Sequence, residues 1–317
     1  MENKGGEMLC VLCGAVGCRV LDCAQSSGNP VKPIQCKTRR FRLRFLCLSV
    51  FVMALSARSF AAELKQKTQD SFNKYVAATE ARMAQELHTG NDFLFVDALP
   101  AGESREDYDR LKSGEILVKR LETKAPGVSA DVPDGLLHHW VGLVFIPGVT
   151  LAQALPVLKD YEYRAELYKP EVSASRLLWH QGDDYKIFLR LYEKKFTTVA
   201  FNTEYNVHWG SLDAHRMYSD TISTRIAQLK DPDNPDKGEY PVGQGNGFLW
   251  RFNTYWRYEE RDGGVYLQCE SVSLTRDIPF GLAWLIKPLV TRIPRDALNR
   301  ALGRTRQVLE EKAKKIE

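Results

Sequence analysis

The chain has 317 residues, of which 44% are hydrophobic and 26% charged, and its formal net charge is +4. This is an ordinary globular composition, and the length suits one large domain or two small ones. Residues 1–61 hold nine of the 44 basic and three of the 40 acidic residues, which leaves 35 bases, 37 acids and a charge of −2 for the rest. Because a nucleic-acid-binding protein needs a basic surface, we expect no nucleic-acid partner.

The first recognisable segment is a secretory signal peptide. Residues 37–44 form a positive n-region, residues 45–56 an apolar h-region, and residues 59–61 a small-x-small cleavage site. A transmembrane anchor is the alternative, but these 12 apolar residues fall short of the roughly 20 that span a bilayer. We therefore expect export to the periplasm or the extracellular space, with cleavage near Ala61 or Ala62 and no stable membrane span afterwards.

The residues ahead of the n-region are surplus to a signal peptide. We expect the true translation start nearer Val31, so that residues 1–62 are a signal peptide preceded by a wrongly assigned extension. Six of the seven cysteines lie in the first 47 residues, and the Cys10-x-x-Cys13 pair permits a zinc or redox site. No helix or strand pattern positions these cysteines, so we expect neither a metal nor another cofactor. Cys269 is predicted to be an inert buried thiol.

Residues 63–130 are predicted to form an extension that packs on the main domain, 131–317. Its helix, 63–87, ends at Gly90 and places six apolar residues near one face. These residues are Leu64, Phe72, Tyr75, Val76, Met83 and Leu87. We then expect a short strand at 93–99, a loop at 100–107 and an edge strand at 114–122.

The main domain opens with a strong strand at 136–147, followed by a helix that Thr150 caps. Neighbouring His138 and His139 must point to opposite faces of this strand, which disfavours a shared metal. We expect one of them to be exposed and the other half-buried. Consecutive antiparallel strands follow over 175–229.

Two aromatic-rich strands, 247–260 and 265–274, are joined by a hairpin connection at 261–264. A terminal helix follows from residue 280, interrupted by Pro288 and Pro294 and continuous over 296–315. This order predicts an α+β fold in which helices cover one face of a curved antiparallel sheet. Strict alternation puts Trp250, Phe252 and Trp256 on one face.

Several motifs resemble those of the START/Bet v 1-like superfamily, also grouped as SRPBCC or polyketide cyclase/dehydrase and lipid-transport proteins. They are HWVGLVFIP at 139–147, STR at 223–225, GFLWRFNTYWR at 247–257, GGV at 263–265 with Glu270, and LTRDIP at 274–279. The resemblance spans about Leu136 to Arg306. It implies the helix-grip fold, a curved antiparallel sheet packed on a long C-terminal helix, here with an additional N-terminal helix.

That resemblance implies a cavity between the sheet and the C-terminal helix. The expected cavity wall is Trp250, Phe252, Trp256, Trp284, Leu189 and Tyr205, and the polar anchors are Arg190, Arg225 and Glu270. An alternative makes Arg225, Arg257 and Glu270 cross-strand ion pairs on the outer face of the sheet. The aromatic residues would serve equally well as plain core.

No nucleophile elbow, HExxH motif, phosphate-binding glycine loop or diagnostic carboxylate pair is present, so no catalytic residue is predicted. We expect a secreted or periplasmic protein that binds a lipid or another hydrophobic small molecule. The alternatives are a cyclase/dehydrase-type enzyme, using a cavity acid or base such as Glu270 or Tyr205, and an envelope protein with a filled core. The sequence predicts no oligomeric state.

Overall fold

The computed structural model describes residues 63–90, 92–194, 197–277 and 292–315. The predicted signal peptide and Trp284 lie outside the described residues. The helices are α2 (Gln66–Thr89), α3 (Ala101–Lys112), α4 (Leu151–Leu158), α5 (Arg164–Leu167) and α7 (Arg292–Ala313), with a 3₁₀ turn, η1 (Pro235–Lys237). The strands are β1 (Leu117–Arg120), β2 (Gly135–Pro147), β3 (Val172–Gln181), β4 (Asp184–Lys194), β5 (Thr198–Ser211), β6 (Arg216–Gln228), β7 (Arg251–Arg261) and β8 (Gly264–Arg276).

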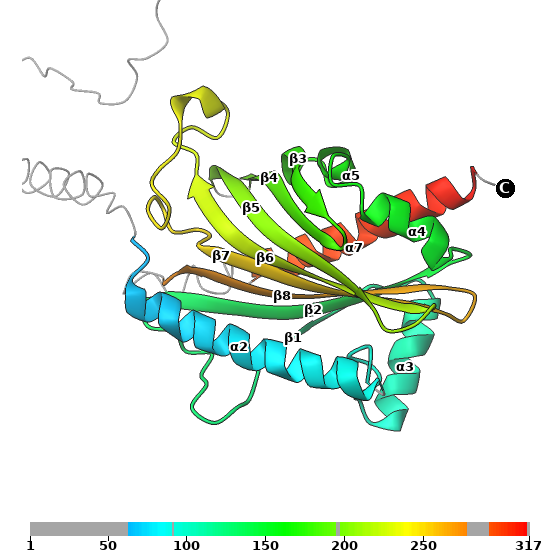
Figure 1. Cartoon of the computed structure of the whole chain (residues 1–317). Coiled ribbons are helices and arrows are strands. Elements are labelled where there is room, and N and C mark those ends of the chain that lie inside the picture. Colours follow the sequence, from blue (N-terminus) through cyan, green and yellow to red (C-terminus); the bar gives the residue numbers. More distant parts are fainter. Residues whose placement is uncertain (1–62, 91, 195–196, 278–291, 316–317) are drawn as a thin grey trace, which may run out of the picture. The chain divides into compact units, whose positions relative to one another are not determined.

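All eight strands belong to one antiparallel sheet in the order β1-β2-β8-β7-β6-β5-β4-β3 (Figure 1). From β3 to β8, strands adjacent in the sequence are adjacent in the sheet, as the predicted series of antiparallel strands requires. The pairing of β2 with β8, Gly135 opposite Arg276, joins the start of the domain to its end. With helices against this sheet, the predicted α+β helix-grip fold is confirmed.

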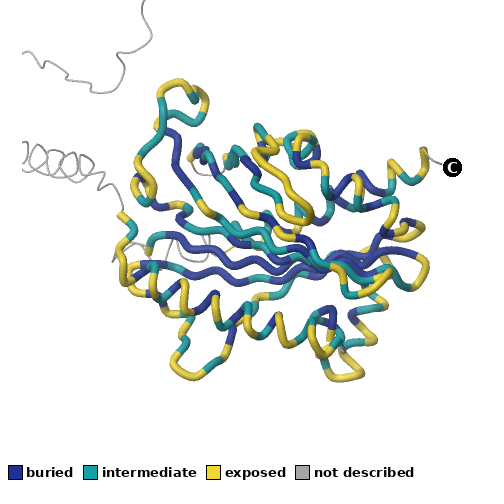
Figure 2. Tube along the Cα trace, in the orientation of Figure 1, coloured by how far each residue is buried: buried dark blue, intermediate teal, exposed yellow. Residues whose placement is uncertain are grey.

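Helices cover both faces of the sheet (Figure 1). On one face, here called the α7 face, Val144 and Ile146 of β2 pack with residues of α4, α5 and α7. On the other, the α2 face, Leu137 packs with α2, and Leu143 packs beside Leu111 of α3. Strands β2 and β8 are consequently buried along most of their length, whereas the edge strand β3 is largely exposed (Figure 2).

The N-terminal helix follows its predicted pattern. Phe72, Tyr75, Val76 and Met83 of α2 are buried, because they recur on one side of the helix and meet the sheet. Gly90 ends the helix at φ 67°, a left-handed conformation that glycine adopts without steric cost. The prediction of helix 63–87 with a stop at Gly90 is confirmed.

Two further local predictions are confirmed. Thr150 accepts a hydrogen bond from the backbone N–H of Gln153, whose side chain accepts one from the N–H of Thr150, which is a capping box at the start of α4. The β7–β8 connection places Asp262 at φ 58° and Gly263 at φ 74°, the pair of positive values that a type I′ turn requires. β1 also lies at an edge of the sheet, as expected.

The segment between α2 and β1 differs from the prediction. Residues 93–99 form turns and not a strand, with the backbone N–H of Leu94 donating to the Asp97 carboxylate at 2.8 Å. Phe93, Leu94 and Val96 are buried without joining the sheet, so their apolar run reflects packing and not strand pairing. Residues 101–112, whose start was predicted to be a loop, form α3, a mostly polar helix that buries only Asp107 and Leu111.

The described residues from 63 onward belong to one compact unit. The segment 63–130 contributes α2 and α3 to the α2 face and β1 to the sheet itself. Within the described part of the chain, no helix combines the length and the apolar character needed to cross a membrane.

Candidate ligand-binding face

The α7 face carries most of the predicted cavity wall. Phe252 and Trp256 of β7, Tyr205 of β5 and Leu189 of β4 all pack in or against the cluster beneath α4, α5 and α7. They meet there because alternate residues of neighbouring strands share a face. The indoles of Trp256 and Trp209 both stack on the Tyr258 ring, with centroid distances of 6.4 and 5.1 Å. The result is a continuous aromatic surface over β5 to β7.

Part of this surface is not sealed. Leu189, Phe252 and Trp256 are only half-buried, as is Trp140 of β2, whereas Val207, Leu267 and Cys269 on the same face are buried. Hydroxyl groups are interspersed with the apolar residues: Ser219 and Thr221 lie on β6 near Trp256. The α7 face therefore combines accessible aromatic surface with small uncharged polar groups, which is the usual lining of a small-molecule site.

Between α4, α5 and strands β6 and β7, the described residues line a small, partly open void of about 20 Å³. It is lined by Leu158, Tyr161, Arg164, Tyr168, Ser219, Thr221, Trp256 and Tyr258. A space of this size holds about one water molecule. No acidic side chain is among the lining residues, so Arg164 brings the one formal charge to this wall.

Tyr205 is the predicted wall residue with the most unusual environment. Its ring is buried, and its hydroxyl oxygen meets no hydrogen-bond partner among the residues that the structure describes. Burial raises the pKa of this phenol above its ordinary value. Tyr205 is thus protonated at neutral pH, where it can donate a hydrogen bond but is a poor base.

Trp250 does not belong to this face, which corrects the prediction that it shares a face with Phe252 and Trp256. It packs with Phe72, Val272 and Leu274 in the cluster under α2. β7 begins at Arg251, so the alternation of side chains between the two faces of the sheet does not extend back to residue 250. Trp284, the remaining predicted wall residue, lies outside the described residues.

The predicted polar anchors likewise avoid the α7 face. Arg190 donates from Nε to Asn202 Oδ1 at 2.8 Å, and Arg225 forms an ion pair with Glu239. Arg225 and Asn202 line an open surface depression of about 650 Å³ beside η1, which lies outside the α7-face cluster. For Arg225 the ion-pair interpretation is therefore the correct one, and we correct the assignment of Arg190 and Arg225 as anchors in a cavity under α7.

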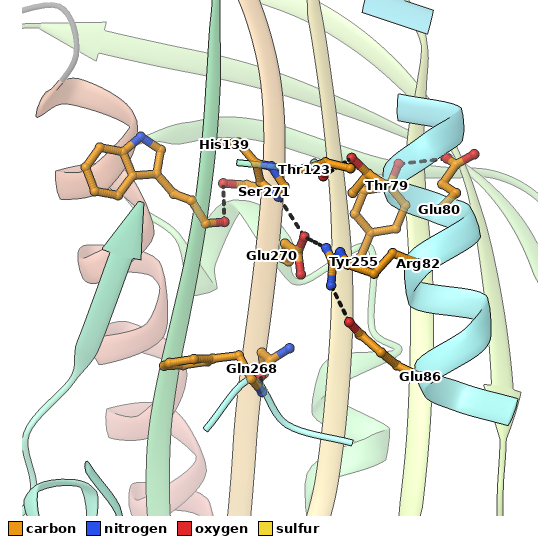
Figure 3. Close-up of polar contacts among 12 residues, drawn as sticks. Thr79, Glu80, Arg82, Glu86, Thr123, His139, Tyr255, Gln268, Glu270 and Ser271 are labelled. Atoms are coloured by element: carbon orange, nitrogen blue, oxygen red, sulfur yellow. Dashed lines mark hydrogen bonds and ion pairs between the residues drawn. The ribbon is translucent and has the colours of Figure 1, made fainter. Parts of the chain in front are cut away.

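Glu270 belongs to a buried charge network on the α2 face (Figure 3). It pairs with Arg82 of α2 and lies 2.6 Å from Nε2 of His139, whose Nδ1 is 2.8 Å from the Tyr75 hydroxyl. Burial alone would raise the pKa of Glu270, but the His139 hydrogen bond and the Arg82 charge outweigh it, so the pKa lies below its usual value. Glu270 is thus a fixed carboxylate that holds α2, which corrects its assignment as a ligand anchor.

The network continues along α2. Glu86 pairs at 2.6 Å with both Arg82 and Arg257, and Arg257 also donates to the backbone oxygen of Phe93. Arg257 and Glu270 are thus ion-paired, but the alternative of cross-strand pairs on an outer face is wrong, because their acidic and basic partners come from α2, which covers this face.

His138 and His139 point to opposite faces as predicted, but both are buried, which corrects the expected exposure of one of them. His138 lies 3.1 Å from the Thr275 hydroxyl. Burial, with a smaller contribution from the charge of Arg120, lowers the pKa of His138 from 6.5 to about 4. Among the described residues no group of three or more His, Cys, Asp or Glu side chains is placed to hold a metal ion.

Sequence reasoning missed the residues of the α4–β3 connection. Tyr161, Arg164 and Tyr168 line the void. For this part of the chain the sequence predicted only the helix that follows Thr150, and no site residue. The available signal was the density of tyrosines around Arg164 in residues 161–168, YEYRAELY, in a segment too short for a long helix.

Comparisons with known proteins found similar solved structures but no matching family or curated sequence. No protein-family model matches the chain, and no curated protein matches its sequence. Solved structures that resemble it include a STAR-related lipid transfer protein from Xanthomonas axonopodis, at 16% identity and a TM-score of 0.37, covering 56% of this chain and 97% of that one. Human STARD10 is 10% identical with a TM-score of 0.37, covering 69% of this chain and 84% of its own.

The Zhui aromatase/cyclase from Streptomyces sp. R1128 is 12% identical with a TM-score of 0.33, and the match covers 54% of this chain and 94% of that one. These matches all have identities below 25% and TM-scores below 0.5, so the description of the fold rests on this chain's own strand order and helix packing. At such identities the likeness does not extend to a ligand or a reaction.

Proposed function

We propose that this protein is an exported binding protein that holds a lipid or another hydrophobic small molecule between the sheet and α7. The observation that carries the proposal is the half-buried apolar strip formed by Leu189, Phe252 and Trp256 on the α7 face. Burying apolar surface is favourable by roughly 25 cal/mol per Å². A ligand that covers the strip would therefore gain binding free energy from this burial. The unpartnered Tyr205 hydroxyl supplies a donor at the same face.

Catalysis receives no such support. One buried acid–base pair, Glu270 and His139, contacts α2 on the far side of the sheet from the strip. The buried histidine of the α7 face, His138, lies 3.1 Å from the Thr275 hydroxyl and makes no hydrogen bond to an acid among the described residues. Tyr205 faces the strip, but its raised pKa disfavours a role as a base. The second candidate is the envelope protein with a filled core, and the small void of about 20 Å³ favours it.

The test is native mass spectrometry of the mature protein purified from its source, followed by titration with a fluorescent fatty-acid probe. We expect an apolar molecule to co-purify and the probe to bind in competition with it. A protein that is empty and also fails to bind the probe would contradict the proposal and favour the filled-core candidate.

Two tryptophans provide a matched control for the place of binding. Trp256→Phe alters the accessible strip, whereas Trp250→Phe makes the same chemical change under α2. We expect the first substitution to weaken probe binding severalfold and the second to leave it unchanged. Equal effects on binding would remove the α7 face as the site.

The export part of the proposal rests on the n-region, h-region and cleavage site of residues 37–61. N-terminal sequencing of the protein from its source should begin at Ala62 or Glu63. Finding the intact 317-residue chain inside the cell would contradict export.

A further inference from the structure

The α4–β3 connection places the guanidinium group of Arg164 in the lining of the proposed ligand site. Arg164 is the first residue of the one-turn helix α5, and its side chain lines the void together with Trp256 and Tyr258 of the sheet. The guanidinium carbon lies 5.1 Å from the centre of the Tyr161 ring and 5.6 Å from that of Tyr168. The aromatic rings hold the guanidinium in place while leaving part of the residue accessible.

Within the described part of the chain, no carboxylate pairs with Arg164. Its NH1 donates to the Tyr168 hydroxyl at 3.1 Å, and its NH2 donates to the carbonyl oxygen of Leu158, so both acceptors are uncharged. The acids nearest in sequence are engaged elsewhere: Glu162 accepts from the backbone N–H of Leu177, and Glu166 pairs with Lys169. By contrast, Arg82, Arg225, Arg257 and Arg300 each pair with a carboxylate.

A partly desolvated cation without a counter-ion is unfavourable in a packed protein. A guanidinium has five N–H donors, and the two bonds described above leave donors available for an incoming oxygen atom. The hydroxyls around it add further donors. Tyr161 accepts from Trp209 Nε1 at 2.8 Å, which leaves its own O–H to donate, and burial raises the pKa values of Tyr161 and Tyr258, so both are protonated at neutral pH.

The same wall continues into the apolar strip. Trp256 lines the void, and Phe252 lies four residues away on the same face of β7, a separation of roughly 13 Å along the strand. Leu189 and Tyr205 extend the strip over β4 and β5. A molecule with a small head at Arg164 would therefore lay an apolar tail across Phe252.

We propose that Arg164 and its tyrosines bind the anionic headgroup, a carboxylate or a phosphate, of an amphiphile whose tail covers the α7-face strip. This inference rests on the proposed function and assigns the ligand class. A void with room for about one water molecule admits one headgroup oxygen, so the head is small and binds by shifting the surrounding side chains.

The experiment compares ligands that differ only in the head. Isothermal titration of the mature protein with hexadecanoate and with hexadecanol, both below their critical concentrations, gives the ratio of the two dissociation constants. Inorganic phosphate alone forms the third arm. Because a charge-assisted hydrogen bond is worth more than a neutral one, we expect the acid to bind about tenfold more tightly than the alcohol.

The variant Arg164→Gln removes the charge, and Arg164→Lys retains it. Arg176→Gln is the matched control, since Arg176 also lies over an aromatic ring, that of Phe188, at 4.7 Å, but does not line the void. We expect Arg164→Gln to abolish the acid preference without weakening alcohol binding, and Arg176→Gln to preserve the preference. The ratio is measured within each variant, so a change in the folded fraction does not mimic the result.

The outcomes separate the two proposals. Equal affinity for acid and alcohol in the unaltered protein overturns the anion site and leaves the hydrophobic carrier intact. An acid preference that persists in Arg164→Gln overturns the assignment to Arg164. Binding of phosphate alone, dependent on Arg164 and without binding of either amphiphile, supports the anion site and overturns the carrier, while no binding in any arm overturns both.

Discussion

The two faces of the sheet differ in whether their charged side chains are paired with carboxylates or cations of the same chain. On the α2 face, charges are buried together with their partners: Glu270 meets Arg82 and His139, and Arg257 meets Glu86. On the α7 face, Arg164 has no carboxylate among the described residues and the Tyr205 hydroxyl has no partner. Aromatic rings there are half-buried, as in the case of Trp256. The buried charges of the α2 face are thus paired within the chain, although Trp250 Nε1 has no hydrogen-bond partner among the described residues. On the α7 face, we propose that a ligand supplies the missing partner of Arg164.

This contrast separates stability from function. A paired buried ion is strongly destabilising to disrupt, since removing one member leaves the other without compensation. Replacing a group that has no partner in the folded chain leaves no other group unsatisfied, so it changes the free energy of unfolding less. Substitutions on the α2 face should therefore change the free energy of unfolding, and substitutions on the α7 face should change binding.

The largest effect is expected for Glu270→Ala. It leaves Arg82 and buried His139 without their shared carboxylate, so the free energy of unfolding should fall by about 4 kcal/mol. Urea denaturation at pH 7 measures this change. A loss below about 1 kcal/mol, the size typical of exposed ion pairs, would mean that the α2 face is not held by its charges.

The next effect is a pH dependence from His138 on the α7 face. Its pKa is lowered from 6.5 to about 4, so between these values the unfolded chain binds a proton that the folded chain does not. Its contribution to stability is present above pH 6.5 and is lost as the pH falls toward 4, by about 3 kcal/mol in total. Denaturation of the unaltered protein and of His138→Gln at pH 7, 5.5 and 4.5 should give a shallower decline for the variant.

The control for this experiment is the exposed His215, whose replacement by Gln should leave the decline unchanged. A decline of equal steepness in His138→Gln would mean that a proton on this histidine is tolerated in the folded protein.

A smaller effect comes from removing one hydroxyl on each face. Tyr255 on the α2 face donates to Glu80 at 2.7 Å, so Tyr255→Phe should lower the free energy of unfolding by about 1 kcal/mol. Tyr205→Phe on the α7 face removes a group without a partner, so it should leave stability unchanged or raise it slightly. Thermal unfolding followed by circular dichroism measures both variants, and equal losses would erase the contrast between the faces.

The smallest effect is expected for Glu239→Gln. Arg225 and Glu239 are partly exposed, with side-chain exposures of 34% and 25%, so water and salt weaken their attraction. The variant should unfold within about 0.5 kcal/mol of the unaltered protein. A loss as large as that of Glu270→Ala would show that exposure does not decide the strength of these pairs.

Regular spacing made most of the fold predictable. α2, the α4 cap, the strands from β2 to β8 and the type I′ hairpin all follow from local patterns of apolar residues, caps and turn formers. The turns at 93–99 were not predictable in this way, because buried Phe93 and Leu94 satisfy the same apolar pattern as a strand residue would. α3 was missed because a mostly exposed helix has almost no apolar periodicity.

The candidate site was predictable only in part. Alternation correctly grouped Phe252 with Trp256, but it does not say which helix each face meets. The sequence was interpreted with one buried face, whereas α2 covers the second, so Glu270 was assigned to the wrong environment. Arg164 lies in a connection without periodic structure, and its role depends on β6 and β7, which only the folded chain brings beside it.

The pairing of β2 with β8 also sets an order of events for a chain that emerges from its N-terminus. Strands β3 to β8 can form from neighbouring hairpins, but β2 gains its long partner only after residue 276 has been released. Until then, the apolar residues of β2 lack the ladder that later protects them. Because contacts this distant in sequence are slow to form, closure of β2 against β8 is expected to limit the rate at which the protein folds.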